Sequence, residues 1–441
     1  CGVSSLEAKP SCCDGLSFRP PWILLNWGSG PISCCCDRLV FVVGMMLGNG
    51  HASSPASRRR RGRPRGGGGS GYGFWQPQSL HHHQQQEISP VVPPCTEFDM
   101  AYFRAYSHIG VHEEMLKDRV RTETYRAAIM RYQHLISDKV VLDVGCGTGI
   151  LAIFCAFAGA RRVYAVDASE IAVQQASEVV KENNLSDKVT VLLGRVEDVS
   201  IDEKVDVIVS EWMGYILLYE SMLPSIIFAR DKWLKPGGLI LPSHASLYMA
   251  PVTHADRYSE SIDFWRDVYG INMSAMLPLA KQCAFEEPCI ETISGENVLT
   301  WPILVKEVDC YTVTIQELES VTAKFSFSSM LRAPLHGFAF WFDVVFNGPA
   351  NYSSNHHLQP PLGSLVDQQS HGSSQSKKRI KSDEGIVLST APEDAPTHWQ
   401  QTLLYLYDPI ELQQDQKIEG SVTLSQSKEN ARFLNIHLEY S

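Results

Sequence analysis

The spacing of apolar positions changes near residue 243 and divides the chain into two parts. Between 138 and 242, short apolar runs rich in β-branched residues are separated by turns and helical stretches, as in a buried parallel sheet. Beyond 243, apolar and polar residues alternate, which predicts an antiparallel barrel or sandwich. The expected strands are 139–144, 162–166, 188–193, 205–210, 239–242, 246–252, 310–315, 323–327, 337–346 and 432–439. We therefore expect a doubly wound α/β domain over 138–242 and a β-barrel domain over 243–441.

Other segments have different patterns. Residues 98–137 have helical spacing, with Tyr102 and Tyr106 four positions apart on one face, and a second amphipathic stretch covers 112–134. The aromatic-rich stretch 259–276 interrupts the barrel strands and either packs on its own barrel or meets a second subunit. Residues 1–97 and about 350–384 lack the composition to bury a core, so we expect a disordered tail and a disordered insertion.

Charge and cysteine content narrow the class of partner and the compartment. The chain has 38 basic and 49 acidic residues, a net charge of −11, with +4 on residues 1–97 and −15 on the remainder. An acidic folded part favours basic protein partners over direct nucleic-acid binding. Scattered cysteines without metal-ligand spacing favour a cytosolic or nuclear protein without a metal. The longest apolar run, 39–47, is about half of the ~20 residues that a membrane span needs.

A glycine-rich turn follows the first strand of the α/β domain. Asp143 precedes Gly145, Gly147 and Gly149, and a helical stretch begins directly afterwards. The dinucleotide fingerprint needs its third glycine one position later, where the chain has isoleucine, which disfavours a pyrophosphate. The pattern suits a cofactor that carries a ribose and an amino-acid tail but no phosphate, such as S-adenosylmethionine. The alternative is an ordinary turn whose glycines serve geometry alone.

Three residues at the ends of the next strands complete this expected cofactor site. Asp167 ends the second strand, where a doubly wound unit places a carboxylate on ribose hydroxyls. Val196 and Glu197 follow the third strand at the same sheet edge, and Glu197 is placed to accept from an adenine amino group. A lone acid in a loop is otherwise a solvated side chain.

A pair of carboxylates follows the fourth strand. Glu211 and Glu220 bracket an apolar loop that pivots on Gly214, and acids beside so much apolar surface need partners. A guanidinium fits two convergent carboxylates, because its donors match carboxylate oxygens two at a time. Two anions also offset the repulsion between a sulfonium and a guanidinium, about 4 kcal/mol at 4 Å for an effective dielectric near 20. The alternative is that both acids form structural ion pairs with nearby arginine or lysine.

Four ordered motifs resemble the protein arginine methyltransferases. Residues 210–215 and 219–223 resemble the double-glutamate loop of that family, 140–149 its first cofactor motif and 112–116 its helix over the cofactor. Residues 397–399 resemble its threonine-histidine-tryptophan loop. The resemblance extends from about residue 99 to the end. It departs at Asp167, where the family usually has glutamate, a change that keeps the charge and shortens the reach.

The resemblance implies roles for further residues. It implies that 98–137 forms a lid over S-adenosylmethionine, that Arg121 binds the cofactor carboxylate, and that the aromatic stretch belongs to a dimerisation arm over about 255–282. His398 is expected to pair with Asp118 and to take up a proton, while Met115, Met213 and Met222 shape the space beside the accepting nitrogen in the asymmetric-dimethylating branch. The expected cofactor contacts also include His112, Met115 and Asp143, and the expected substrate contacts Tyr102, Tyr106 and Trp399.

The sequence thus predicts a homodimeric enzyme that methylates arginine in basic proteins such as histones and Gly/Arg-rich proteins, and that gives monomethylarginine and asymmetric dimethylarginine. We expect a nuclear, and also cytoplasmic, protein, with basic clusters at 58–65 and 377–381 as import signals or merely as solvated charge. The cluster at 58–65 is also a candidate for self-methylation. Two alternatives are a methyltransferase of small molecules and a catalytically silent scaffold or coregulator-binding module.

Overall fold

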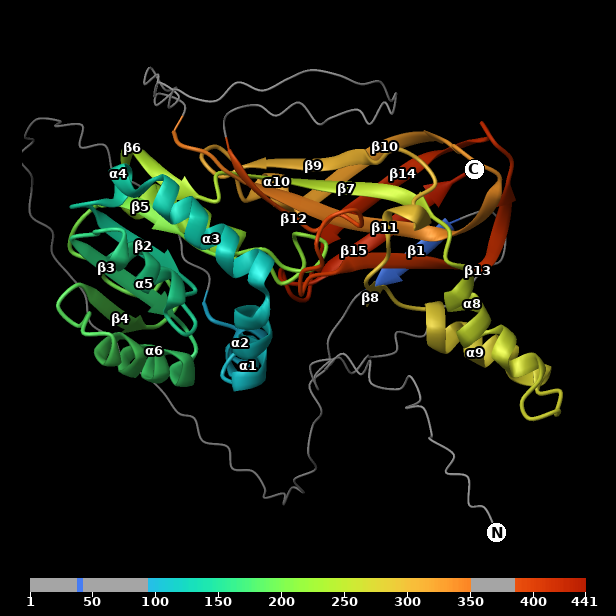
Figure 1. Ribbon diagram of the computed structural model, residues 1–441, viewed down its shortest axis with the longest axis horizontal. Coiled ribbons are helices and arrows are strands. Elements are labelled where there is room, and N and C mark those ends of the chain that lie inside the picture. Colours follow the sequence, from blue (N-terminus) through green and yellow to red (C-terminus); the bar gives the residue numbers. More distant parts are fainter. Residues whose placement is uncertain (1–37, 43–93, 350–384) are drawn as a thin grey trace, which may run out of the picture.

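The computed structural model describes residues 38–42, 94–349 and 385–441. An α/β domain and a β-barrel lie side by side, and a helical arm projects from the barrel (Figure 1). Strand β1 (Arg38–Val42) pairs antiparallel with the last strand of the barrel, so the prediction of disorder is wrong for this part of 1–97. The rest of the tail through 93, both basic clusters and the predicted insertion lie outside the described residues.

Among the described residues, four helices precede the first strand of the parallel sheet in the chain. The stretch predicted as one amphipathic unit over 112–134 is broken at Asp118, whose backbone is extended and whose carboxylate accepts the Arg121 N–H at 2.9 Å. Asp118 therefore ends one helix and caps the next. The helices are α1 (Glu97–Ala105), α2 (Ile109–Lys117), α3 (Arg119–Arg131) and α4 (Gln133–Ile136).

The α/β domain contains a parallel sheet in the order β4-β3-β2-β5-β6. Strand β2 is buried along its whole length and lies between β3 and β5, with which it pairs in parallel. The chain adds β3 and β4 on one side of β2 and then β5 and β6 on the other side, so the strand order reverses at β2. In open α/β sheets, ligands bind outside the carboxyl ends of strands at such a reversal. The elements are β2 (Val140–Val144), α5 (Ile150–Phe157), β3 (Arg162–Asp167), α6 (Glu170–Glu182), β4 (Val189–Leu193), β5 (Val205–Val209), α7 (Leu223–Trp233) and β6 (Leu234–Leu241).

Two antiparallel sheets form the barrel, in the orders β8-β13-β11-β7-β9, with β12 also on β11, and β1-β15-β14-β10. Phe338, Phe340 and Phe342 of β11 join the large core, while Ala339 and Trp341 join a second cluster on the other face. The strands are β7 (His244–Val252), β8 (Cys289–Glu291), β9 (Ile303–Asp309), β10 (Ser320–Ser328), β11 (Ala333–Phe346), β12 (Ile386–Ser389), β13 (Gln401–Leu412), β14 (Lys417–Gln426) and β15 (Leu434–Tyr440).

The predicted strand at 310–315 is wrong. The strand is β9, and the chain turns where β9 ends because the Asp309 carboxylate accepts the Tyr311 N–H at 2.9 Å and the Thr312 hydroxyl at 3.0 Å. Alternating side chains in this turn imitate a strand pattern although the backbone is tied back on itself. Strands β8, β12, β13 and β14 were not predicted from the sequence.

The aromatic stretch forms much of the projecting arm (Figure 1). The arm comprises α8 (Ala255–Ser261), two short 3-10 helices (Asp263–Arg266 and Ser274–Met276) and α9 (Leu277–Phe285). Tyr269 at its tip is 99% exposed, and Ile271 is 62% exposed. No helix among the described residues is long and apolar enough to cross a membrane, and no group of three or more potential metal ligands occurs among them.

Candidate functional site

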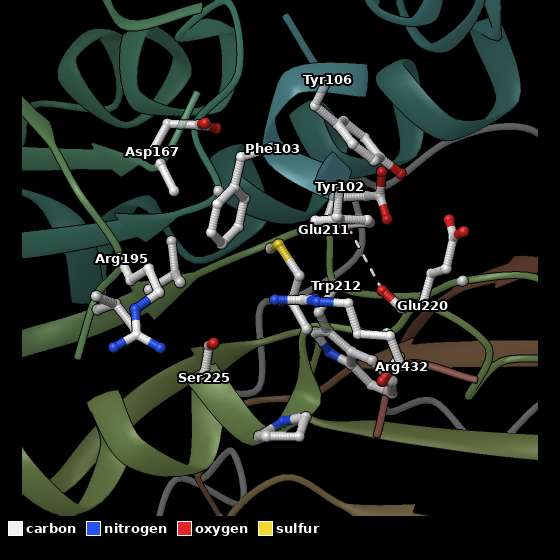
Figure 2. A pocket seen from close by; sticks show the side chains of 18 of the residues that line it. Tyr102, Phe103, Tyr106, Asp167, Arg195, Glu211, Trp212, Glu220, Ser225 and Arg432 are labelled. Atoms are coloured by element: carbon white, nitrogen blue, oxygen red, sulfur yellow. Dashed lines mark hydrogen bonds between the residues drawn. The ribbon is translucent and has the colours of Figure 1, made fainter. Parts of the chain in front are cut away.

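A cavity of about 1190 Å³ lies at the carboxyl edge of the parallel sheet, between the helices α1 and α2, the loop after β5 and the barrel. Side chains from these elements converge on it (Figure 2). Of the residues predicted from the sequence, Asp143 and Asp118 are not part of its lining. The predicted residues that line it are Tyr102, Tyr106, His112, Met115, Arg121, Gly145, Gly147, Asp167, Val196, Glu197, Glu211, Met213, Glu220, Met222, His398 and Trp399.

The glycine turn needs its glycines for two reasons. Gly145, Gly147 and Gly149 have φ values of +73°, +52° and +84°, a region that L side chains rarely adopt. A Cβ atom on Gly145 would also lie 2.3 Å from the Met222 side chain. Asp167 holds the turn from the next strand, because its Oδ2 accepts the Gly147 N–H at 2.8 Å. Burial raises the pKa of Asp167, and hydrogen bonds from backbone amides oppose the rise.

Asp143 lies beneath the turn instead of on the cavity wall. Its side chain is fully buried, and the backbone of Ala152 in α5 donates toward its carboxylate. Burial raises the pKa of Asp143 to about 7. Asp143 therefore links β2 to α5, the two elements that flank the glycine turn.

The second carboxylate of the loop, Glu220, is buried and strained. Its φ is +57°, its N–H donates to the Arg432 carbonyl at 2.8 Å, and its Oε1 has no partner among the described residues. Burial raises the pKa of Glu220 to about 7, while the positive charge of Arg432 opposes the rise. A buried carboxylate without a partner is costly unless a cation binds it, and strained backbone of this kind clusters at functional sites.

The tight loop between the two acids requires Gly214. A Cβ atom at this position would lie 1.5 Å from the Tyr219 carbonyl oxygen, so any other residue would displace the loop. The Gly214 N–H donates to the Leu217 carbonyl at 3.1 Å, and Ile216 and Leu217 both have positive φ. The loop thus folds back and directs Glu211 and Glu220 into one cavity.

The first carboxylate, Glu211, binds Arg121 in this structure. The Nε and Nη2 atoms of Arg121 donate to Oε2 of Glu211 at 3.1 and 3.0 Å, and the side chains are only 7% and 8% exposed. The sequence analysis left open, as an alternative, that the two acids form structural ion pairs. Such an ion pair is present at Glu211. Within the described hydrogen bonds, Arg121 uses Oε2 alone, which leaves Oε1 of Glu211 for another donor.

Comparison with known proteins identifies the family. Residues 243–357 and 377–441 match the model of the arginine methyltransferase oligomerization subdomain, and residues 123–243 match that of the ribosomal protein L11 methyltransferase. Over 359 residues, the chain is 69% identical to the probable protein arginine N-methyltransferase 6 of Arabidopsis thaliana, covering 81% of this chain and 82% of the relative. The chain belongs to the protein arginine N-methyltransferase family. The predicted resemblance is confirmed.

Other members of this family extend the likeness. Protein arginine N-methyltransferase 6 of Xenopus tropicalis is 45% identical, covering 78% of this chain and 92% of its own. The structure of the Trypanosoma brucei PRMT1 enzyme-prozyme heterotetrameric complex with AdoHcy has a TM-score of 0.63 and 35% identity, covering 76% and 95% of the two chains. Arabidopsis thaliana protein arginine methyltransferase 10 has a TM-score of 0.61 and 36% identity, covering 77% and 94%. The predicted combination of α/β domain and β-barrel is confirmed.

In this methyltransferase, the loop before β13 connects the barrel to the junction between α2 and α3. The Nδ1 atom and the backbone N–H of His398 lie 2.7 and 2.8 Å from Oδ2 of Asp118, which also caps α3. Burial tends to raise the pKa of Asp118, but hydrogen bonds from His398 and Arg121 outweigh it and hold the pKa below its usual value. Trp399 donates from Nε1 to the Met213 carbonyl at 3.2 Å and thereby ties the same loop to the carboxylate loop.

Tyr102 of α1 and Tyr106, the residue that follows α1, line the cavity beside the carboxylates. The rings of Tyr102 and Tyr106 lie 4.7 Å apart, and the Tyr102 hydroxyl is 3.5 Å from the Glu220 carbonyl oxygen (Figure 2). Burial raises the pKa of both hydroxyls, so they remain neutral donors near neutral pH. The predicted position of these tyrosines on one helix face explains why both reach the cavity.

Sequence reasoning missed two residues of the methyltransferase site. The Ser225 hydroxyl donates to Oε1 of Glu197 at 2.7 Å and orients that acid in the cavity. Arg432, in the connection between β14 and β15, reaches the cavity from the barrel. A serine at the start of a helix and an arginine in a polar hairpin connection lack a periodic signal, so only the fold brings them to the site.

Proposed function

We propose that this chain transfers methyl groups from S-adenosylmethionine to guanidino nitrogens of arginine in basic proteins, including histones and Gly/Arg-rich proteins, with monomethylarginine and asymmetric dimethylarginine as products. The observation that carries the proposal is the presence of Glu211 and Glu220 in the same cavity as the glycine turn. The net charge of −15 outside the tail supports basic substrates. The homologous enzymes support transfer to arginine.

The cavity fits S-adenosylmethionine, which would supply an electrophilic methyl group on a sulfonium. The glycine turn leaves room where a Cβ atom on Gly145 or Gly147 would meet other side chains. Asp167 and Glu197 offer carboxylate oxygens for hydroxyl and amino groups, and Arg121 offers donors for a carboxylate. A solved relative with this fold was obtained with AdoHcy.

The two glutamates would hold the guanidinium of the substrate. Their charges offset a repulsion of about 4 kcal/mol between two cations 4 Å apart at an effective dielectric near 20. Because Glu220 is fixed by a strained backbone and lacks a side-chain partner within the described residues, it is organised before the substrate arrives. His398, held by Asp118, would accept the proton that the methylated guanidinium releases. In-line displacement then depends mainly on positioning and charge.

The value of kcat/KM for an arginine peptide is expected to rise with pH through about 7 in this proposal. Glu220 is neutral below its pKa of about 7 and anionic above it, and only the anion can bind the guanidinium. Initial rates at low peptide concentration between pH 5.5 and 9 give the profile, with a fixed saturating concentration of cofactor. A flat profile between pH 6 and 8 would contradict the assignment of Glu220.

The product type is tested by mass spectrometry and amino-acid analysis of a histone mixture and a Gly/Arg peptide after incubation with labelled S-adenosylmethionine. We expect monomethylarginine first and then asymmetric dimethylarginine, because Met115, Met213 and Met222 line the cavity and resemble the residues that shape the space beside the accepting nitrogen in the asymmetric-dimethylating branch. Symmetric dimethylarginine would contradict the product assignment alone. If no basic protein is methylated, the result would favour the catalytically silent scaffold. If only small molecules are methylated, it would favour the alternative of a small-molecule methyltransferase.

We also propose a nuclear location for the enzyme, supported by the basic clusters at 58–65 and 377–381 and by the histone substrates proposed above. A fluorescent fusion of the whole chain gives the distribution between nucleus and cytoplasm. Replacement of both clusters by neutral residues is the matched variant. Retention in the nucleus would show that these clusters are solvated charge and do not direct import.

A further inference from the structure

The connection between β14 and β15, residues 427–433, reaches from the barrel to the carboxylate loop. The carbonyl of Arg432 accepts the N–H of Glu220 at 2.8 Å. Glu220 has left-handed backbone, which a side-chain-bearing residue keeps only when its surroundings fix it. Arg432 therefore restrains the backbone that aims the second glutamate.

The side chain of Arg432 binds the lid. Its Nε donates to Oδ1 of Asp99 at 2.9 Å, and both side chains are 18% exposed. Its guanidinium carbon lies 4.2 Å from the Tyr102 ring centroid and 5.5 Å from that of Phe103. Asp99 also accepts the Thr96 N–H through Oδ2 and so caps the start of α1. One arginine thus joins the start of the lid, Tyr102 and the barrel.

The following residue strengthens the same contact. The ring of Phe433 stacks on Tyr219 of the carboxylate loop at 6.1 Å and meets Phe98 of α1 edge-on at 6.2 Å. Arg432 and Phe433 therefore contact both α1 and the carboxylate loop. Figure 2 shows Tyr102, Glu220 and Arg432 reaching it from three different elements.

We propose that Arg432 is a positioning residue for arginine recognition, which aims Glu220 through its carbonyl, holds Tyr102 through its guanidinium and supplies the positive charge that the Glu220 carboxylate senses. This inference rests on the proposed function of Glu220. It assigns a role in substrate binding to a hairpin connection of the barrel. It also adds a second contribution of the barrel to the site, beside the loop that carries His398 and Trp399.

The groups around Glu220 allow the charge effect to be measured. Four tyrosines interact with it: Tyr102 in α1, Tyr106 just after α1, and Tyr215 and Tyr219 in its own loop. Burial raises the pKa of all four hydroxyls. They stay neutral between pH 6 and 9. Glu211, across the cavity, is paired with Arg121. The charge of Arg432 lowers the pKa of Glu220, so its removal is expected to raise that pKa.

Three variants of the full chain separate this role from a purely structural one. In the pH profile of kcat/KM, Arg432→Met should move the midpoint of the acidic limb to a pH about 0.5 to 1 unit higher. It should also raise the KM for the peptide about tenfold. Arg432→Lys keeps the charge and should leave the midpoint within about 0.2 unit. Asp99→Asn keeps Arg432 and should also leave the midpoint in place, while it weakens cofactor binding by loosening the lid. Arg432→Gln replaces the methionine variant if the latter does not fold.

An unchanged midpoint in a folded Arg432→Met variant would overturn the proposal, as would equal shifts in all three variants. The titration of Glu220 can also be followed by carbon-13 NMR, with Glu220→Gln for assignment, and does not require turnover. If the unaltered chain methylates no basic protein, the proposed function fails. The NMR titration then still decides whether the charge of Arg432 acts on Glu220: an upward shift in Arg432→Met supports that part, and no shift refutes it.

Discussion

The variant Glu211→Gln is expected to methylate an arginine peptide about 10³-fold more slowly, with a dissociation constant for S-adenosylmethionine within about tenfold of the original. The amide removes one of the two negative charges that offset the cationic substrate and cofactor. It also releases Arg121, which has Glu211 as its carboxylate partner among the described ion pairs, and so leaves that arginine free to bind the cofactor. Single-turnover rates and isothermal titration measure the two quantities separately.

Glu123→Gln is the matched control, because Glu123 forms an exposed ion pair with Arg119 on α3 and does not line the cavity. Exposed pairs of this kind contribute about 0 to 1 kcal/mol, so its rate and affinity should stay close to the original values. If a folded Glu211→Gln variant no longer bound the cofactor, Glu211 would belong to the cofactor half of the site.

The double variant Phe264→Glu with Ile271→Glu is expected to give monomers and to lower activity by tenfold or more. Both side chains are exposed on the arm, at 50% and 62%, within the part of the chain that matches the oligomerization subdomain. A large exposed apolar patch marks an interaction surface, and a closed dimer would bury the same patch twice. The two substitutions in each subunit would bury four charges at that interface, at a cost of several kcal/mol. Multi-angle light scattering and initial rates measure the outcome.

Trp301→Ser is the control for this experiment, since Trp301 is 73% exposed just before β9 and outside the arm segment. It should leave both mass and rate unchanged. Dimers that persist in the double arm variant would place the subunit interface elsewhere, whereas monomers with full activity would show that assembly is not needed for methyl transfer.

Local sequence patterns determined much of the site. The glycine turn directly follows β2, Asp167 ends β3, and Glu211 and Glu220 belong to the loop after β5. Parallel strands present their carboxyl ends at one edge of a sheet. Their gathering in one cavity therefore follows from strand order and chain polarity. Tyr102 and Tyr106 are brought together by helical spacing alone.

The remaining features depend on contacts between distant parts of the chain. Arg121 reaches Glu211 across 90 residues, and Arg432 reaches Asp99 across 333. A single charged residue in a helix or hairpin has several possible partners, and its ion pair forms only after packing has fixed both backbones. The strand near 310 was misplaced, and β13 and β14 were missed, because the bounds of strands also depend on contacts between distant parts of the chain. Alternation fixes which face of a strand is buried, but pairing with β11 and β10 decides where these strands begin and end.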